Sequence, residues 1–313
     1  MPCHTADNQP LTDAVVFGDV RYQNGDFADG SRLMTEPDQA TIEVHLKQAS
    51  QSFHEVVDFS MRVSLALGGA PVIRSALPSI VHTKMTINGA SAEQLLKAPL
   101  KDHSAIIGVC RMIMEASILF QYLMEEVSSE EWHCRLLCLN LHDTVNRIKL
   151  MRGFQTKEER KALPHNREQL ETELKEDAFF KTLPNERAEA LLTGEHFYLR
   201  GVNKAVRQSG WDTEKYMSFY SYFSAHAHSA PMSFFRFRRQ YTNFAEPSEV
   251  QQAIVATALS VAEYSLLKAT ILHLDTTPER HGKFKAEEVE EMRGRLEQWK
   301  AHFEAAMDGG SSA

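Results

Sequence analysis

The sequence predicts an all-α fold, a multi-helix bundle around a central apolar helix, with a loosely structured N-terminal arm. From Thr41 onward, apolar residues recur with a period near 3.6 over long stretches. Runs that alternate apolar and polar residues, as strands do, are scarce. The 313 residues, 43% apolar and 24% charged, are typical of a globular protein with one large or two ordinary domains.

Charge and cysteine usage narrow the class of protein. A net charge of −8 argues against a main role in non-specific binding to nucleic acid or to an anionic membrane. The four cysteines, Cys3, Cys110, Cys134 and Cys138, lack the spacing of a disulfide framework or a zinc ribbon. The start of the chain lacks the basic and apolar segments of a signal peptide. We therefore expect a cytoplasmic protein.

Residues 1–40 are rich in Asp, Asn, Gly and Pro, which predicts a flexible arm. Ala14–Tyr22 can form a strand, and the turn signals Asn24-Gly25 and Asp29-Gly30 after it allow one short hairpin. A helical bundle domain is expected over residues 41–275. Its first helix ends at Gly68. Pro71 and Pro78 bracket a shorter helix, and Ala90–Ala98 forms another small one.

The segment His103–Glu126 is the most apolar of the chain. It is long enough to cross a bilayer, but Arg111 and Glu115 lie in its middle, where charge is costly. We expect it to be the central helix of a bundle, with the next helix running to about Met151.

Residues 156–182 are strongly charged and interrupted by Pro164. This insert is expected to be a solvated helical hairpin or arm, and to be the region that moves or binds a partner. Short helices follow at 184–193 and 198–208. Beyond the segment 233–244, which is not obviously helical, come an apolar helix over 246–273, a C-terminal amphipathic helix within 276–308, and a disordered tail at 309–313.

One predicted helix, Trp211–Ser233, carries a polar ladder. Asp212 is a helix-capping residue, and Pro231 ends the helix. Tyr216, Tyr220, Ser224 and His228 recur every four residues and share one side of the helix, while His226 lies on a neighbouring stripe. The pattern resembles the wall of a ligand pocket.

Arg111 and Glu115 are one helical turn apart and can pair directly. Either they form a structural ion pair, or Glu115 faces the ladder, where it acts as a base or orients His228. The candidate catalytic residues are therefore His228, Glu115, Arg111 and Ser224. A nucleophilic role for Ser224 is disfavoured, because a helix interior leaves no backbone N–H groups for an oxyanion hole.

No metal or cofactor is predicted. His226 and His228 diverge by about 200° on a helix, so they do not share a metal. Cys134, Cys138 and His142 descend one side of a helix, and with Asp143, Glu115 and His228 they form the set to test. Cysteines among leucines are more often small core residues.

Two basic features suggest a second class of function. Arg135 and His142 fit the Arg-x4-6-His pattern of HEPN-type helical ribonucleases, although a polar stripe on a packed helix is the favoured explanation of these two residues. The run Phe234–Arg239, which includes Arg236, interleaves rings and guanidinium groups that stack on bases and bind phosphates. It also fits an extended segment with its rings packed inward.

Two segments resemble a broad bacterial helical family of unknown function. They are the Arg-x3-Glu helix, Arg111–Leu123, and the Tyr…Ser-x3-His helix, Tyr216–Ser229. The resemblance covers about residues 41–275 and implies a helical bundle with Arg111, Glu115, Ser224 and His228 near one another. It implies no particular activity.

These observations favour a ligand-binding or regulatory protein with one polar Arg/Glu/Ser/His pocket. Its ligand-binding residues are Tyr216, Tyr220, His226, Arg236, Arg135 and His142. The alternative is a HEPN-like, metal-independent RNA endonuclease of a toxin or defence type. A third possibility is a scaffold. The expected partners are an unknown small ligand or RNA, with no membrane, and a homodimer is possible through the charged hairpin or the C-terminal helix.

Overall fold

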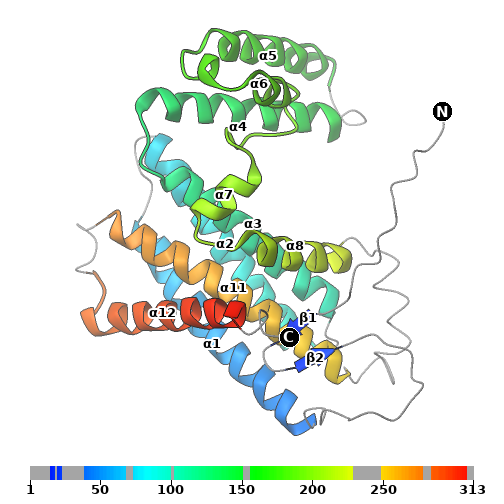
Figure 1. Ribbon diagram of the computed structural model, residues 1–313, viewed down its shortest axis with the longest axis vertical. Coiled ribbons are helices and arrows are strands. Elements are labelled where there is room, and N and C mark those ends of the chain that lie inside the picture. The colour runs from blue at the N-terminus through cyan, green and yellow to red at the C-terminus, as the bar shows by residue number, and fades with distance from the viewer. Residues whose placement is uncertain are drawn as a thin grey trace, which may run out of the picture. The chain divides into compact units, whose positions relative to one another are not determined.

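The computed structural model describes residues 15–17, 20–22, 39–67, 73–99, 102–150, 156–227, 248–277 and 283–308. The all-α prediction is confirmed (Figure 1). The described strands are one short antiparallel hairpin, β1 (Val15–Phe17) and β2 (Val20–Tyr22). The helices are α1 (Gln39–Leu67), α2 (Ile73–Lys97), α3 (His103–Met124), α4 (Ser129–Leu150), α5 (Lys157–Glu176), the 3-10 helix η1 (Phe180–Thr182), α6 (Asn185–Leu192), α7 (Val202–Gln208), α8 (Thr213–Ala227), α11 (Glu249–Asp275) and α12 (Ala286–Asp308).

The chain divides into two compact units. The first comprises Met1–Gly69, His82–Met114 and Phe223–Ala313, and the second comprises Ala70–Val81 and Glu115–Tyr222. The two boundary positions within helices α3 and α8 separate Arg111 from Glu115, and Tyr220 from Ser224.

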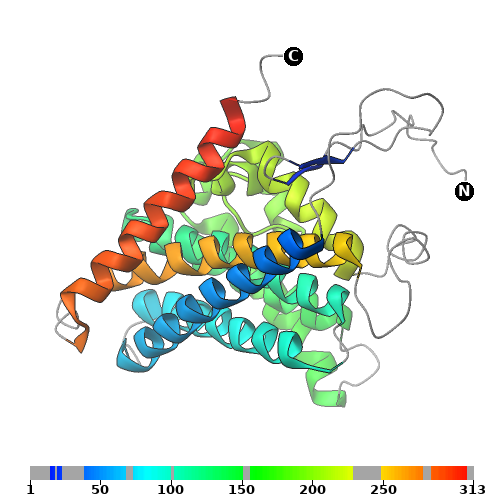
Figure 2. The same cartoon turned by 90° about the horizontal axis from the view of Figure 1, so that it is seen from below.

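In the first unit, α11 packs along α1, and α12 packs against α11 (Figure 2). By length and composition, α3 and α11 could each cross a bilayer, but 56% and 78% of their most apolar windows are buried within the protein. Burial on most sides is how the core helices of a folded domain behave. α11 is the more deeply buried of the two.

A single helix, α2, replaces the two short helices predicted between Pro71 and Ala98. Pro78 lies inside it. A proline within a helix removes one hydrogen bond and costs about 3 kcal/mol. Pro78 is buried, and the same helix continues through the buried residues His82, Met85 and Ala92. Burial of this face offsets the cost of the proline. Local sequence signals contain no information about this burial.

The second unit has its own core around α4. Its buried members are Cys134, Leu137, Cys138, Leu141, Val145, Leu174, Phe180, Leu191 and Leu199. The charged insert, predicted to be a solvated helical hairpin or arm, has one α-helix within residues 156–182 and packs it on this core. It forms one helix, α5, with Pro164 inside it, and Leu170 and Leu174 pack against this core. Because apolar residues at such spacing share one face of a helix, the charged residues occupy the other face.

The ladder helix begins as predicted. The backbone N–H of Lys215 donates to Asp212 Oδ1 at 2.9 Å, which caps α8. The described part of α8 ends at Ala227, and residues 228–247 lie outside the described residues. The helix predicted over 198–208 is shorter, since it begins only after Gly201, whose φ is 84°.

Candidate functional site

The structure describes eight of the ten predicted site residues. Arg111 and Glu115 are half-buried on α3, and Ser224 and His226 are half-buried in the last turns of α8. Tyr216, Tyr220, Arg135 and His142 are considered below. His228 and Arg236 lie outside the described residues, so the proposed pairing of Ser224 with His228 stays a prediction.

Within the first unit, α3 and the end of α8 approach closely. A Cβ atom on Gly108 would lie 3.5 Å from the Cβ atom of Ala227, at van der Waals contact. Arg111 lies one helical turn after Gly108, and Ser224 one turn before Ala227. Both residues therefore flank the point where the two helices touch.

The Ser224 hydroxyl is buried and has no hydrogen-bond partner among the residues that the structure describes. Leaving a buried hydroxyl unsatisfied costs about 1–3 kcal/mol, so such groups are rare in folded proteins. The usual explanation is a bound water, ion or ligand atom at that position. Ser224 Oγ is therefore the candidate contact for a small polar group.

The second unit holds a cluster of tyrosines. The rings of Tyr122 and Tyr198 meet edge to face with centroids 5.0 Å apart. Those of Tyr216 and Tyr220 are stacked at 6.3 Å. Burial raises the pKa of Tyr198, and the nearby Tyr216, Tyr122 and Glu115 raise it further. Glu115 therefore lies near the tyrosines of α8 and α3, and the Tyr198 phenol stays protonated.

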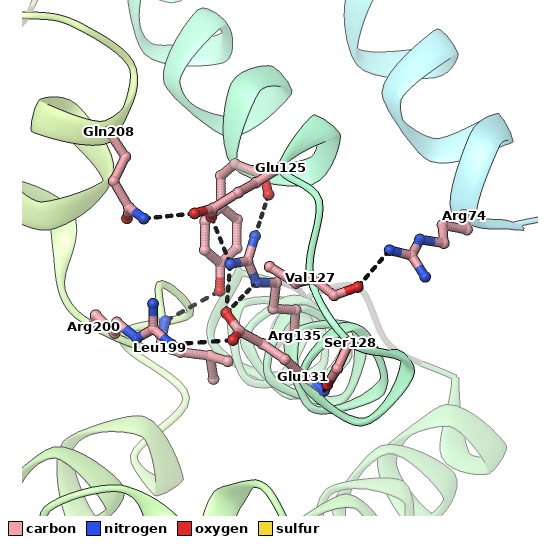
Figure 3. Close-up of polar contacts among 10 residues, drawn as sticks. Arg74, Glu125, Val127, Ser128, Glu131, Arg135, Leu199, Arg200 and Gln208 are labelled. Atoms are coloured by element: carbon pink, nitrogen blue, oxygen red, sulfur yellow. Dashed lines mark hydrogen bonds and ion pairs between the residues drawn. The ribbon is translucent and has the colours of Figure 1, made fainter. Parts of the chain in front are cut away.

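Arg135 is the largest fully buried side chain of the second unit, only 2% exposed (Figure 3). Its Nε donates to Glu131 at 3.2 Å, and its Nη2 donates to Glu131 and Glu125, each at 2.6 Å. Its Nη1 donates to the Tyr122 carbonyl. The guanidinium also lies over the Tyr122 ring, 4.0 Å from the centroid. Every nitrogen is committed, so Arg135 is a structural cross-link.

The partners of Arg135 are themselves held in place. Arg200 Nη2 donates to Glu131 Oε2 at 3.1 Å, and Gln208 Nε2 donates to Glu125 Oε1 at 2.6 Å. Figure 3 shows that Arg200 reaches Glu131 and that Gln208 reaches Glu125, the two carboxylates that Arg135 also contacts. Two arginines and two glutamates balance in charge. The predicted role of Arg135 in ligand binding has no support in this geometry.

His142 is also engaged through both ring nitrogens. Its Nδ1 lies 2.9 Å from the Gly194 carbonyl oxygen, and its Nε2 lies 2.9 Å from Asn146 Nδ2. These partners assign the proton to Nδ1, since a carbonyl oxygen accepts and an amide nitrogen donates. Arg135 and His142 thus do not form an open pair of the kind that the HEPN resemblance implies.

The cysteines of α4 are core residues. Cys134 and Cys138 are fully buried. A hydrogen bond with Cys138 and burial together raise the pKa of the Cys134 thiol. A thiol that stays protonated is a poor metal ligand. Within the described ranges, no group of three or more His, Cys, Asp or Glu side chains is arranged to hold a metal ion.

Sequence reasoning missed a buried histidine network in the first unit. His82 Nδ1 lies 2.9 Å from Ser64 Oγ, and His82 Nε2 lies 2.9 Å from Thr270 Oγ1. Thr270 Oγ1 in turn lies 2.8 Å from Ser60 Oγ. Ser60 and Ser64 at a spacing of four on one helix were the only local signal, because Thr270 lies 188 positions from His82.

A family model described as a family of unknown function, DUF5677, matches residues 82–243, just over half of the chain. This confirms the predicted resemblance to a family of unknown function, over a shorter range than the predicted 41–275. No curated protein and no solved structure matches the chain.

Proposed function

We propose that the chain, which belongs to the DUF5677 family, is a cytoplasmic ligand-binding or regulatory protein whose ligand contacts Ser224. The observation that supports the proposal is the buried Ser224 hydroxyl, which has no hydrogen-bond partner within the described ranges. A ligand that supplies that partner recovers the free energy lost when the hydroxyl is buried.

The surroundings of Ser224 favour a small ligand with an acceptor group. Gly108 and Ala227 bring α3 and α8 into van der Waals contact one turn away. This close packing favours a small ligand over a large one. On α3, Gly108 lies one helical turn before Arg111, which carries a guanidinium group. A carboxylate or phosphate oxygen suits both the hydroxyl and the arginine.

Thermal melting with phosphate, acetate and adenosine monophosphate tests the proposal. We expect a concentration-dependent rise in Tm for at least one of these anions. Ser224→Ala should abolish the rise and leave the unliganded protein equally stable or more stable, because it removes an unsatisfied hydroxyl. Ser218→Ala, at an exposed position of the same helix, is the matched control. An equal rise in wild type and Ser224→Ala would exclude Ser224 from the site.

The ribonuclease alternative is tested in parallel. Purified protein is incubated with single-stranded RNA in the presence of a chelator, and His142→Ala and His228→Ala are compared with wild type. Because Arg135 and His142 are both engaged, we expect the RNA to stay intact. Cleavage by wild type that both histidine variants lose would favour the ribonuclease instead.

A further inference from the structure

A second, separate recess lies in the first unit. The N-terminal half of α1, the last turns of α2 and the start of α11 enclose an open cleft of about 710 Å³. Volumes of about 300–1,000 Å³ are those of sites for small metabolites. The cleft shares no residue with the Ser224 region, so an inference about the cleft does not depend on the proposed function.

The cleft has one shielded carboxylate. The Glu93 side chain is only 12% exposed, and its Oε1 lies 3.1 Å from His54 Nδ1. Its Oε2 lies 4.0 Å from Lys97 Nζ. Both oxygens of Glu93 are thus opposed by a nitrogen-bearing side chain. With Nδ1 directed at the carboxylate, Nε2 is the ring nitrogen left for a ligand, and it donates to an anion when the ring is protonated on both nitrogens.

The cleft also has an uncompensated cation. Lys47, on the same face of α1 as His54, forms no hydrogen bond or ion pair with any described residue. The remaining carboxylate of the lining, Glu43, lies one turn before Lys47 on that helix. The side chains of Leu46 and Leu96 add apolar surface beside these charges.

From this arrangement we infer that the cleft binds a small organic anion. Its carboxylate or phosphate group would lie between Lys47 and Lys97, within reach of His54, and its apolar body would pack on Leu46 and Leu96. Lysine ammonium groups bind such anions as point charges, and in the absence of a ligand Glu93 is the carboxylate that His54 and Lys97 contact.

The test measures binding of phenyl phosphate and benzoate by titration, with neutral benzamide as the comparison. We expect either anion to bind and benzamide not to bind, and the stronger of the two anions identifies the preferred group. Lys47→Gln and Lys97→Gln should each raise the Kd by about threefold or more, since each removes one cation. Lys84→Gln, an exposed lysine on α2 that does not line the cleft, should leave the Kd unchanged.

Glu93→Gln separates a binding role from a structural one. Removing the competing carboxylate frees His54 and Lys97 for the ligand, so the Kd for the anion should fall. If Glu93 only stabilised the fold, this variant would lower Tm and leave the Kd as it was. The inference is overturned if neither anion binds, if Lys84→Gln weakens binding as much as Lys47→Gln does, or if Glu93→Gln fails to tighten it. Ser224→Ala leaves all of these results unchanged.

Discussion

The Nε2 atom of His82 lies 2.9 Å from the Thr270 hydroxyl and joins α2 to α11 inside the first unit. On its other side, Nδ1 meets Ser64, and the His273 ring lies 5.1 Å away. Burial and the neighbouring His273 lower the pKa of His82 to about 3. His82 is therefore a neutral hydrogen-bonding group in the folded protein.

This histidine predicts a loss of stability in mild acid. Its folded pKa of about 3 lies below the unfolded value, so only the unfolded chain takes up a proton as the pH falls from about 6.5 toward 3. The stabilisation is full above pH 6.5 and is lost progressively below it, by about 2 kcal/mol at pH 5. Urea denaturation of His82→Gln and wild type from pH 7.5 to pH 5 measures it. His133→Gln, at an exposed position, is the control.

His82→Gln should be less stable than wild type at pH 7.5 and should show a shallower dependence on pH. A dependence as steep as that of wild type would show that another group titrates. Retention of the full pH dependence in His133→Gln is required for the same conclusion.

Arg135 predicts a large effect of truncation. Arg135→Ala leaves the buried carboxylate of Glu131 without its closest cation, which costs about 3–5 kcal/mol. Urea denaturation followed by circular dichroism measures the loss. Arg147→Ala is the control, because the exposed Arg147 lies 4.0 Å from Asp143, and such pairs contribute about 0–1 kcal/mol. Equal effects of the two substitutions would contradict a structural role for the Arg135 cluster.

Gly194 predicts a steric clash. Its φ is +70°, and a Cβ atom there would lie 2.4 Å from Val145 Cγ2. Gly194→Ala should therefore destabilise the protein by about 2–4 kcal/mol. Adding Val145→Ala should recover part of that loss by making room for the new methyl group. Gly294→Ala, in the middle of α12 with nothing within 4 Å of its Cβ, should stabilise by about 0.5–1 kcal/mol. Thermal melts of wild type, Gly194→Ala, the double variant and Gly294→Ala measure these changes in stability.

The hydrogen bonds of Glu263, on α11, predict how α12 is held against its neighbouring helices. Its Oε1 accepts hydrogen bonds from Ser52 Oγ at 2.8 Å, Arg295 Nη2 at 3.0 Å and Trp299 Nε1 at 2.9 Å. Glu263→Ala removes the acceptor shared by α1 and α12, so amide hydrogens of α12 should exchange faster with solvent. Glu297→Ala, at an exposed position of α12 where the carboxylate pairs with Lys300, is the matched control. Unchanged exchange in Glu263→Ala would show that apolar contacts alone hold the helix.

Much of the fold follows from local signals in the sequence. The 3.6-residue period predicted the helices. Asp212 predicted the start of α8, which it caps by accepting a hydrogen bond from the Lys215 backbone N–H. Pro78 and Pro164 misled the prediction, because each lies inside a helix whose buried face offsets the cost of the proline. Propensity rules report that cost and contain no information about the burial.

The polar interior was less predictable. The charges of Arg111 and Glu115 and the ladder on α8 were visible in the sequence, since spacing on one helix is a local property. The partners of His82 and Glu263 were not visible. Thr270 is 188 positions from His82, and Ser52 is 211 positions from Glu263. Only tertiary packing brings these groups together, and one sequence carries no signal of it.

The buried cysteines give each unit an internal chemical reporter. Cys110 belongs to the first unit, and burial raises its pKa to about 12. Cys134 and Cys138 lie in the core of the second unit. A thiol-reactive dye reaches these sulfur atoms only after the surrounding helices part. In a Cys3→Ser background, the labelling rate at Cys110 therefore times the opening of one unit, and the rate at the other two cysteines times the opening of its neighbour.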